Sequence, residues 1–327
     1  MADDCVLAVH GGAGVLSREL FHSRELSHKS GNEDECRAAL EAALQAGYAV
    51  LMKPEAQAKD ATSVDAVVAA VCVLEDAPCF NAGRGAAFTR DGQIELDASI
   101  MDGATRRAGA VACVTTVKNP IVAARLVMDR SGHVMFFGPA ADAFAREHGA
   151  EIVPRDYFHT ELRWRLLQEE LMKPEALAKD VPDARPGSRC GTVGCVALDG
   201  RGNLAAGTST GGMTGKLSGR VGDTPIIGGG TLADNASCAV SVTGDGEYLI
   251  RAVAAHDIAA LVEYKGLSVA EAARIVIHEK VRPAGGEGGA IVLDRFGRLA
   301  MTYSSEGMYR GYITRDGRMR VMIYREE

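Results

Sequence analysis

Runs of alternating or continuous apolar residues predict β-strands along much of the chain. Buried strands read as about four to eight mostly apolar residues bounded by glycine or polar turn residues. On this pattern we expect strands at residues 5–9, 133–137, 192–198, 203–210, 237–243, 290–294, 298–304 and 320–324. The glycine-rich residues 10–14 after the first strand read as a tight turn with positive φ angles.

Apolar residues spaced three and four apart predict helices between these strands. We expect Ser63 to cap one helix, Asn119 to cap another with Pro120 at its first position, and Ser268 with Glu271 to form a capping box. The expected helices span residues 34–52, 63–74, 120–128, 139–148 and 246–264, with a further one opening at 268.

Two stretches lack both periodicities. Residues 17–33 are polar and read as a surface excursion, and residues 175–190 are rich in Pro, Asp, Gly and Ser, which predicts a mobile linker. Strands and paired helices do not alternate as regular βαβ units elsewhere. The sequence therefore favours packed α and β layers, the α+β class.

Composition narrows the possible functions. The 327 residues carry a net charge of −7 without a concentrated basic face, so we expect no nucleic-acid partner. We find no run of about 18 apolar residues and no secretory signal in residues 1–14, so we expect no membrane association and a cytoplasmic protein.

The spacing of the cysteines and histidines indicates neither disulfide bonds nor a metal site. The eight cysteines are scattered without a CxxC motif, which indicates thiols without disulfide bonds in a reducing compartment. The eight histidines form no ligand-spaced cluster. The residues therefore predict neither a His/Cys metal site nor a cofactor for the chemistry.

One familiar motif offers a nucleophile. Residues 207–211 fit GxSxG, with Ser209 in the place of the nucleophilic serine. That motif requires a helix directly after the serine, whereas glycine-rich residues 211–215 follow here. A serine hydrolase using Ser209 is one alternative.

A second candidate nucleophile stands at the boundary between the linker and a strand. A threonine hydroxyl is activated by a nearby base, and the threonine's own α-amino group can serve once Thr is the first residue of a chain. Gly191 precedes Thr192 where the polar segment gives way to an apolar strand. Self-cleavage between Gly191 and Thr192 would supply that amine, whose ordinary pKa of about 7.7–8.0 suits a base at neutral pH.

Two further features surround Thr192 on this interpretation. If the turn at residues 199–203 is centred on Arg201, the strands before and after it form a hairpin that places Thr192 opposite Thr210. The strand ending at Thr243 and Gly244 precedes a helix, and a glycine N–H at such a corner can donate to an anion.

These residues together resemble the plant-type L-asparaginase/isoaspartyl aminopeptidase (β-aspartyl peptidase) family of N-terminal nucleophile (Ntn) hydrolases. The matching sequences occur in collinear order along nearly the whole chain: HGGAG (10–14), FNAGRG (80–85), ELDA (95–98), MDG (101–103), GTVG (191–194), STGG (209–212), GRVGDTP (219–225), TG (243–244) and EGMY (306–309).

The resemblance implies a fold and an assembly. It implies one domain over residues 1–327 with a four-layer αββα sandwich. Cleavage between 191 and 192 would give an α subunit (1–191, with a flexible tail from about 175) and a β subunit (192–327). Two such heterodimers would assemble into a heterotetramer.

The resemblance also implies roles for single residues. Thr192 would be the nucleophile, Thr210 would hold its hydroxyl, and Thr243 with Gly244 would form the oxyanion hole. The substrate's α-carboxylate and α-ammonium would bind Arg220 and Asp223, and Asn81 would lie beside the nucleophile as a substrate-binding residue. The backbone carbonyls of a structural Na⁺ or K⁺ loop would come from Leu74, Glu75, Ala77, Phe80, Ala82 and Arg84.

The implied activity is hydrolysis of L-asparagine to L-aspartate and ammonia, and of N-terminal β-aspartyl dipeptides. Leu232 stands where the family often has Tyr, which affects the expected pocket shape. Besides the serine hydrolase, an unprocessed, inactive paralogue is an alternative.

Overall fold

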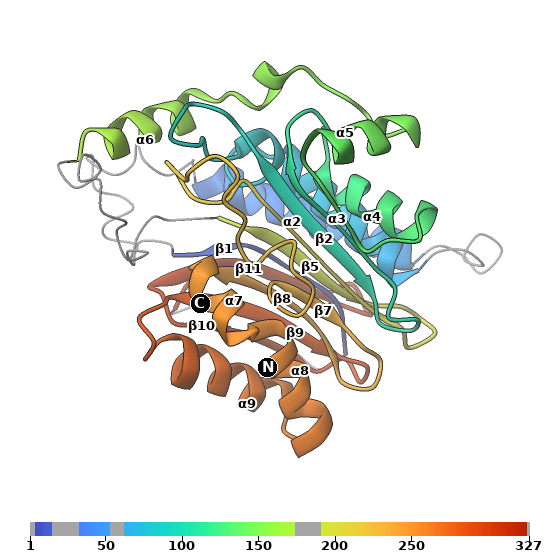
Figure 1. Cartoon of the computed structure of the whole chain (residues 1–327). Helices are drawn as coiled ribbons and strands as arrows, with labels where there is room; N and C mark the ends of the chain where they lie inside the picture. The colour runs from blue at the N-terminus through green and yellow to red at the C-terminus, as the bar shows by residue number, and fades with distance from the viewer. Residues whose placement is uncertain (1–3, 15–32, 53–61, 174–190, 326–327) are drawn as a thin grey trace.

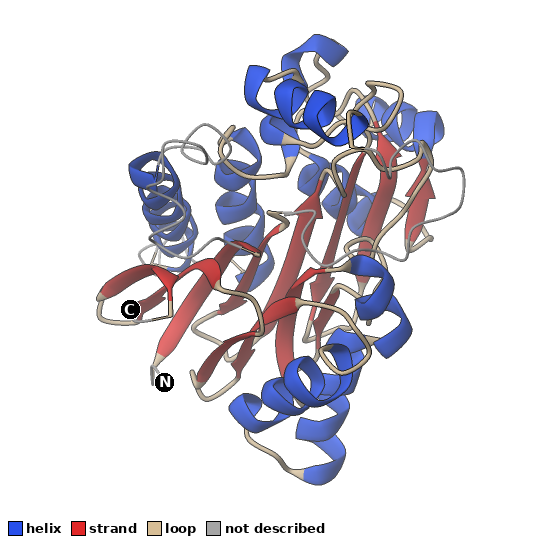
Figure 2. Ribbon diagram, turned by 90° about the vertical axis from the view of Figure 1, so that its left-hand side faces the viewer, coloured by secondary structure: helices blue, strands red, loops and turns tan. Residues whose placement is uncertain are grey.

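The computed structural model describes residues 4–14, 33–52, 62–173 and 191–325. Within these ranges the strands form two sheets in the middle of the molecule, and helices lie on either side of them (Figures 1 and 2). The predicted linker at 175–190 and the predicted excursion at 17–33, apart from its last residue, lie outside the described residues.

The larger sheet has eight strands in the order β12-β11-β1-β5-β6-β2-β3-β4, and the smaller has four in the order β10-β9-β8-β7. Neighbouring strands are antiparallel except β3 and β4. The large sheet consists of β1 (Cys5–Ala13), β2 (Leu96–Asp102), β3 (Ala108–Val114), β4 (Met135–Phe137), β5 (Val193–Leu198), β6 (Leu204–Thr210), β11 (Gly307–Thr314) and β12 (Met319–Tyr324). The small sheet consists of β7 (Thr231–Ala233), β8 (Cys238–Gly244), β9 (Gly288–Asp294) and β10 (Leu299–Tyr303).

Helices cover the outer faces of the two sheets. The large sheet is covered by α2 (Glu33–Leu51), α3 (Ser63–Asp76) and α4 (Pro120–Arg130), and the small one by α8 (Ala254–Lys265) and α9 (Val269–Arg274). The remaining helical segments are α5 (Gly138–Glu147), α6 (Glu161–Leu171), α7 (Gly246–Ala252), a π-helical continuation of α9 (Ile275–Val281) and the 3₁₀ segments Gly83–Gly85 and Arg155–Phe158. This mixture of helices and mainly antiparallel sheets is compatible with the predicted α+β class.

Two apolar cores separate the layers. One lies between the large sheet and α2, α3 and α4, and the other includes the space between the sheets. Strand β5 contributes to both, because Val193 and Cys195 face the helices whereas Val196 and Leu198 face the small sheet. Even-numbered positions on this strand therefore point between the sheets.

Several predicted elements differ in extent. Strand β1 continues through residues 10–13, and the positive φ of Gly12 occurs within this bulged strand, so the predicted turn was wrong. Thr62, one residue before Ser63, caps α3 and forms a capping box with Asp65. The helix predicted over 246–264 breaks at Val253, which adopts a left-handed conformation.

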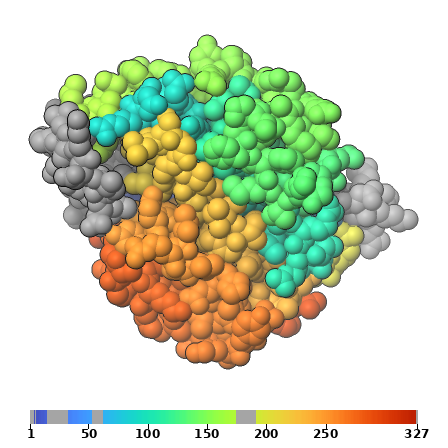
Figure 3. Space-filling view, in the orientation of Figure 1, coloured from blue at the N-terminus to red at the C-terminus, as the bar shows by residue number. Residues whose placement is uncertain are grey.

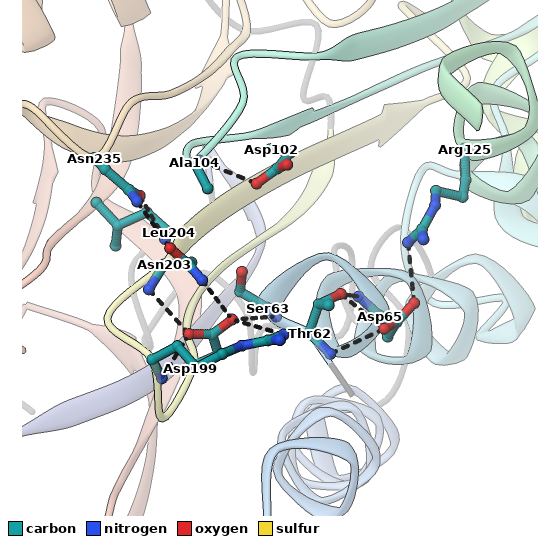
Figure 4. A network of polar contacts seen from close by, with 11 residues as sticks. Thr62, Ser63, Asp65, Asp102, Ala104, Arg125, Asp199, Asn203, Leu204 and Asn235 are labelled. Atoms are coloured by element: carbon teal, nitrogen blue, oxygen red, sulfur yellow. Dashed lines mark hydrogen bonds and ion pairs between the residues drawn. The ribbon is translucent and has the colours of Figure 1, made fainter. Parts of the chain in front are cut away.

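The far end of the β5–β6 hairpin is fixed by polar contacts (Figure 4). The Asp199 carboxylate accepts the N–H groups of Arg201 and Asn203, each at 2.9 Å, which closes the predicted turn. The side-chain amide of Asn235 accepts the Leu204 N–H at 2.9 Å and donates to the Asn203 side chain at 3.0 Å. These bonds hold the register of the hairpin that carries the candidate site at its other end.

Candidate active site

Thr192 and Thr210 meet at the open end of the β5–β6 hairpin. Val193 pairs with Ser209, so the residue before β5 stands opposite the last residue of β6. The two threonine Oγ1 atoms are 3.0 Å apart, and the residues are only 4% and 3% exposed. The structure thus confirms the predicted register and places both hydroxyls between the sheets.

Asn81 ties the two strand ends together. Its backbone N–H donates to the Gly191 carbonyl at 3.1 Å, and its own carbonyl accepts the Gly211 N–H at 3.0 Å. The side-chain Nδ2 donates to the Gly212 carbonyl at 2.6 Å, while Oδ1 accepts the Ala87 N–H at 2.7 Å. Asn81 therefore lies beside the candidate nucleophile, as predicted, and its amide group fixes the protein backbone there.

Thr243 and Gly244 approach from the small sheet. Thr243 is buried, and its Oγ1 accepts the Ala13 N–H at 3.2 Å. Ser241, which is on β8 with Thr243, packs against β5: a Cβ atom placed on Gly194 would lie 2.0 Å from Ser241 Oγ. Because Ser241 lies against Gly194 and Thr243 lies two residues further along β8, the Thr243 end of β8 reaches the Thr192 end of β5.

Arg220 and Asp223 converge on Gly246, the first residue of α7. A Cβ atom placed on Gly246 would lie 2.8 Å from Arg220 Nη2 and 3.0 Å from Asp223 Oδ1. Glu247, which the sequence did not single out, accepts Arg220 Nε at 2.8 Å and lies 2.7 Å from Nη2 through the same Oε1. We call Arg220, Asp223 and Glu247 the clamp cluster. Gly246, which the clamp residues surround, lies two residues after Gly244, so the clamp and the candidate oxyanion hole share one strand-to-helix corner.

Arg220 and Asp223 lie in the long segment between β6 and β7, whereas Glu247 lies in α7. This segment reaches the surface between residues of the large-sheet half and those of α7 and α8, as the gold surface between the green and orange regions of Figure 3 shows. Glu95, directly before β2, holds this segment at two points: its carboxylate accepts the Gly219 N–H at 2.9 Å, and its carbonyl accepts Lys216 Nζ at 2.9 Å.

Burial controls the charge state of the clamp. Desolvation raises the pKa of Asp223 to about 7; Arg220 opposes this rise, whereas the negative charges of Glu247 and Asp97 add to it. Asp97 is itself fully buried on β2, which raises its pKa. Asp223 therefore titrates close to neutral pH in the folded protein.

A buried chain of hydroxyl groups runs between the sheets from His10. His10 Nε2 lies 2.8 Å from Ser241 Oγ, which lies 2.7 Å from Thr208 Oγ1. Thr231 Oγ1 donates to Thr208 Oγ1 at 2.6 Å, and Ser99 Oγ donates to Thr231 Oγ1 at 2.8 Å. Burial lowers the pKa of His10 to about 3, so the imidazole is neutral at physiological pH. The sequence reading missed this network because it placed His10 in a turn.

Ser209 lies on the wrong side of β6 for the serine-hydrolase alternative. It is a neighbour of Glu75 on α3, whereas Thr208 and Thr210 point between the sheets. Among the described residues no histidine hydrogen-bonds to Ser209, and β6 is followed by turns instead of a helix. The structure does not provide the geometry that a nucleophilic serine in this motif needs.

The loop after α3, in which the predicted cation-binding carbonyls lie, packs closely around two glycines. A Cβ atom on Gly83 would lie 2.4 Å from the Glu75 carbonyl oxygen, and one on Gly85 would lie 2.0 Å from that of Phe80. The Ala77 and Ala82 carbonyls turn into the same loop and accept the N–H groups of Phe80 and Gly85. These distances describe close backbone packing, and the Na⁺ or K⁺ site stays a prediction.

The described part of the chain holds no cluster of three His, Cys, Asp or Glu side chains suited to a metal ion. In that part, too, no helix has the length and apolar character needed to cross a bilayer. None of the cysteines whose side chains are described forms a disulfide bond.

Comparison with known proteins decides the family. A family model described as "Asparaginase" matches residues 3–323. The chain belongs to this asparaginase family. It is 47% identical over 324 residues to an isoaspartyl peptidase of Escherichia coli, an alignment that covers 98% of this chain and 97% of that protein. It is 40% identical to a probable isoaspartyl peptidase/L-asparaginase of Arabidopsis thaliana, covering 97% and 98%, and 38% identical to an isoaspartyl peptidase/L-asparaginase of Bos taurus, covering 93% and 91%. This asparaginase-family chain is a hydrolase.

Proposed function

We propose that this hydrolase converts L-asparagine to L-aspartate and ammonia and cleaves N-terminal β-aspartyl dipeptides, with Thr192 as its nucleophile. The contact between Thr192 Oγ1 and Thr210 Oγ1, in a threonine that follows Gly191 directly, carries the proposal. The names of the relatives support this choice of substrates, since isoaspartyl peptidase and L-asparaginase both occur in those names.

Activation begins with a break in the backbone. The Thr192 hydroxyl attacks the Gly191 carbonyl carbon, the C–N bond between these residues breaks, and water hydrolyses the resulting ester. The products are the 1–191 and 192–327 chains, and Thr192 gains an α-amino group. The hydrogen bond that Asn81 donates to Gly191 and the hydrogen bond between the Thr210 and Thr192 hydroxyls favour this attack by fixing both partners.

Turnover uses the same hydroxyl. The Thr192 amine takes the hydroxyl proton as Oγ1 attacks the substrate's side-chain carbonyl, and it then passes that proton to the departing ammonia or amine. The Thr243 hydroxyl and the Gly244 N–H stabilise the oxyanion, a contribution of about 2.7–4 kcal/mol per donor. Water then hydrolyses the β-aspartyl ester and releases L-aspartate.

The clamp cluster selects an amino-acid head group. Arg220 is suited to the α-carboxylate through paired N–H donors, and ionised Asp223 to the α-ammonium. Asn81 acts from beside Thr192 by holding both strand ends at the site.

The remaining architecture follows the same family pattern in our proposal. The two sheets and their outer helices would constitute the αββα sandwich of an Ntn hydrolase, and two cleaved heterodimers would assemble in the cytoplasm. Carbonyl groups of Leu74, Glu75, Ala77, Phe80, Ala82 and Arg84 would hold Na⁺ or K⁺, which would stiffen the loop that carries Asn81. No chemical step requires that ion.

Intact-mass analysis combined with an ammonia assay tests this function. Purified protein should give two chains that separate between Gly191 and Thr192, and it should release ammonia from L-asparagine and leucine from β-Asp-Leu. Thr192→Ala should stay a single chain and release neither product. A Thr192→Ala protein that still cleaves itself would refute the assignment, and an uncut wild-type protein without ammonia release would favour the inactive paralogue.

A further inference from the structure

Glu247 connects the clamp to the first turn of α7. Its Oε1 atom accepts Arg220 Nε at 2.8 Å and lies 2.7 Å from Nη2, so one carboxylate oxygen spans one edge of the guanidinium. The Arg220 side chain is 17% exposed and that of Glu247 40%, so the ion pair is partly desolvated on its arginine side. Charge-assisted hydrogen bonds in such surroundings restrict the orientation of a long side chain.

The same glutamate lies close to Asp223. The Asp223 carboxylate and the Arg220 guanidinium both lie over Gly246, directly before Glu247. Glu247 Oε2 and Asp223 Oδ2 are buried oxygens without a hydrogen-bond partner among the described residues. Two unsatisfied carboxylate oxygens beside one arginine are suited to a ligand that brings its own positive charge.

We propose that Glu247 is a positioning residue of the clamp: it holds the guanidinium of Arg220 over Gly246 and places a second negative charge beside Asp223. This inference rests on the proposed function, because it assigns Arg220 and Asp223 to the substrate's α-carboxylate and α-ammonium. It gives Glu247 two separable effects, one through geometry and one through charge.

The geometric effect concerns substrate affinity. Without the carboxylate, Arg220 can adopt other rotamers, and the substrate must bear the entropy cost of ordering it. The charge effect concerns pH. The groups acting on Asp223 are Arg220 from the same loop, Glu247 from α7 and Asp97 from β2, and the first lowers its pKa whereas the other two raise it. Removing the Glu247 charge therefore lets Asp223 ionise at lower pH.

Three variants separate these effects. Glu247→Gln removes the charge but keeps the shape, Glu247→Asp keeps the charge but shortens the reach, and Glu279→Gln removes a glutamate from an exposed pair with Arg274 as a matched control. For Glu247→Gln we expect KM for L-asparagine to rise about tenfold with kcat within about twofold. We also expect the acid limb of L-aspartate affinity, which does not require the Thr192 amine to act as a base, to move to lower pH. Glu247→Asp should raise KM without moving the acid limb, and Glu279→Gln should match wild type.

A merely structural role would lower kcat and kcat/KM together and leave the acid limb in place; that result, or wild-type kinetics in Glu247→Gln, would overturn the proposal. Binding of L-aspartate, measured by isothermal titration calorimetry, gives a test without turnover, because Kd should rise about tenfold in Glu247→Gln. Unchanged L-aspartate affinity would refute the role of Glu247. A wild-type protein that binds L-aspartate but neither cleaves itself nor releases ammonia would instead refute the proposed function.

Discussion

Replacing Thr210 with valine tests the central contact of the candidate site. Valine has nearly the shape of threonine, so the substitution removes the hydroxyl and little else. That hydroxyl lies 3.0 Å from Thr192 Oγ1 and accepts the Gly212 N–H at 3.1 Å. Because Thr210 is buried, water cannot easily replace either bond.

The structure sets the size of the expected effect. A buried N–H left without an acceptor costs about 1–3 kcal/mol, and the lost hydroxyl pair adds about 1 kcal/mol. Thr210→Val should therefore destabilise the protein by about 2–4 kcal/mol and lower the melting temperature by about 5 °C or more. The Thr192 hydroxyl also loses the partner that orients it, so self-cleavage should slow by a factor of about 10–100.

Time-resolved intact mass after purification measures cleavage, and thermal unfolding of the uncut fraction measures stability. Thr210→Ser is the matched control because it keeps the hydroxyl and should cleave at nearly the wild-type rate. If Thr210→Val cleaves as quickly as Thr210→Ser, the contact does not orient the nucleophile. If its melting temperature equals that of wild type, the Gly212 N–H has found another acceptor and the energetic reasoning fails.

Two further predictions concern the surrounding framework. Because burial lowers the folded-state pKa of His10 to about 3, the unfolded chain binds the extra proton between about pH 6.5 and 3, and stability falls as pH drops through this window. At pH 4.5 this lowers the free energy of unfolding by about 2–3 kcal/mol. Urea unfolding at pH 7 and 4.5 should therefore show a smaller loss of stability for His10→Gln than for wild type. Equal losses would contradict a buried neutral imidazole. Gly246→Ala places a methyl group 2.8 Å from Arg220 Nη2 and should raise KM for L-asparagine at least about tenfold while self-cleavage continues, whereas a normal KM would show that the clamp is displaced without consequence.

Local patterns predicted the β5–β6 hairpin because its determinants are local. The turn residues Asp199 and Asn203 close onto each other within five positions, and the flanking strands are buried on both faces. Register then follows from counting outward from Arg201, which placed Thr192 opposite Thr210. Interpretations of this kind succeed when the residues that fix a geometry are near neighbours in sequence.

Two of the strands that the sequence patterns did not predict have a different composition. Strands β2 and β3 (LDASIMD and AGAVACV) are rich in small residues, which carry weak strand propensity. Their small side chains are needed because α4 packs directly on β3: a Cβ atom on Gly109 would lie 2.0 Å from the Ala124 carbonyl oxygen. Close packing of layers, which is a tertiary property, therefore selected residues that conceal the strand pattern.

The clamp cluster was also only partly predictable from the sequence. Arg220 and Asp223 stand three residues apart, so their opposite charges were visible in one glycine-rich loop. Glu247 is 27 positions from Arg220 and looks like an ordinary first-turn helix glutamate, where negative charge is favoured by the helix dipole. Only the fold brings that turn against the loop, because β8 of the small sheet ends near the start of β5 and α7 begins two residues later. Residue spacing in the sequence therefore cannot identify a residue that acts on the substrate through another side chain. Comparing the kinetics of Glu247→Gln, which loses the charge, with those of Glu247→Asp, which loses the length, is the measurement that reveals such a role.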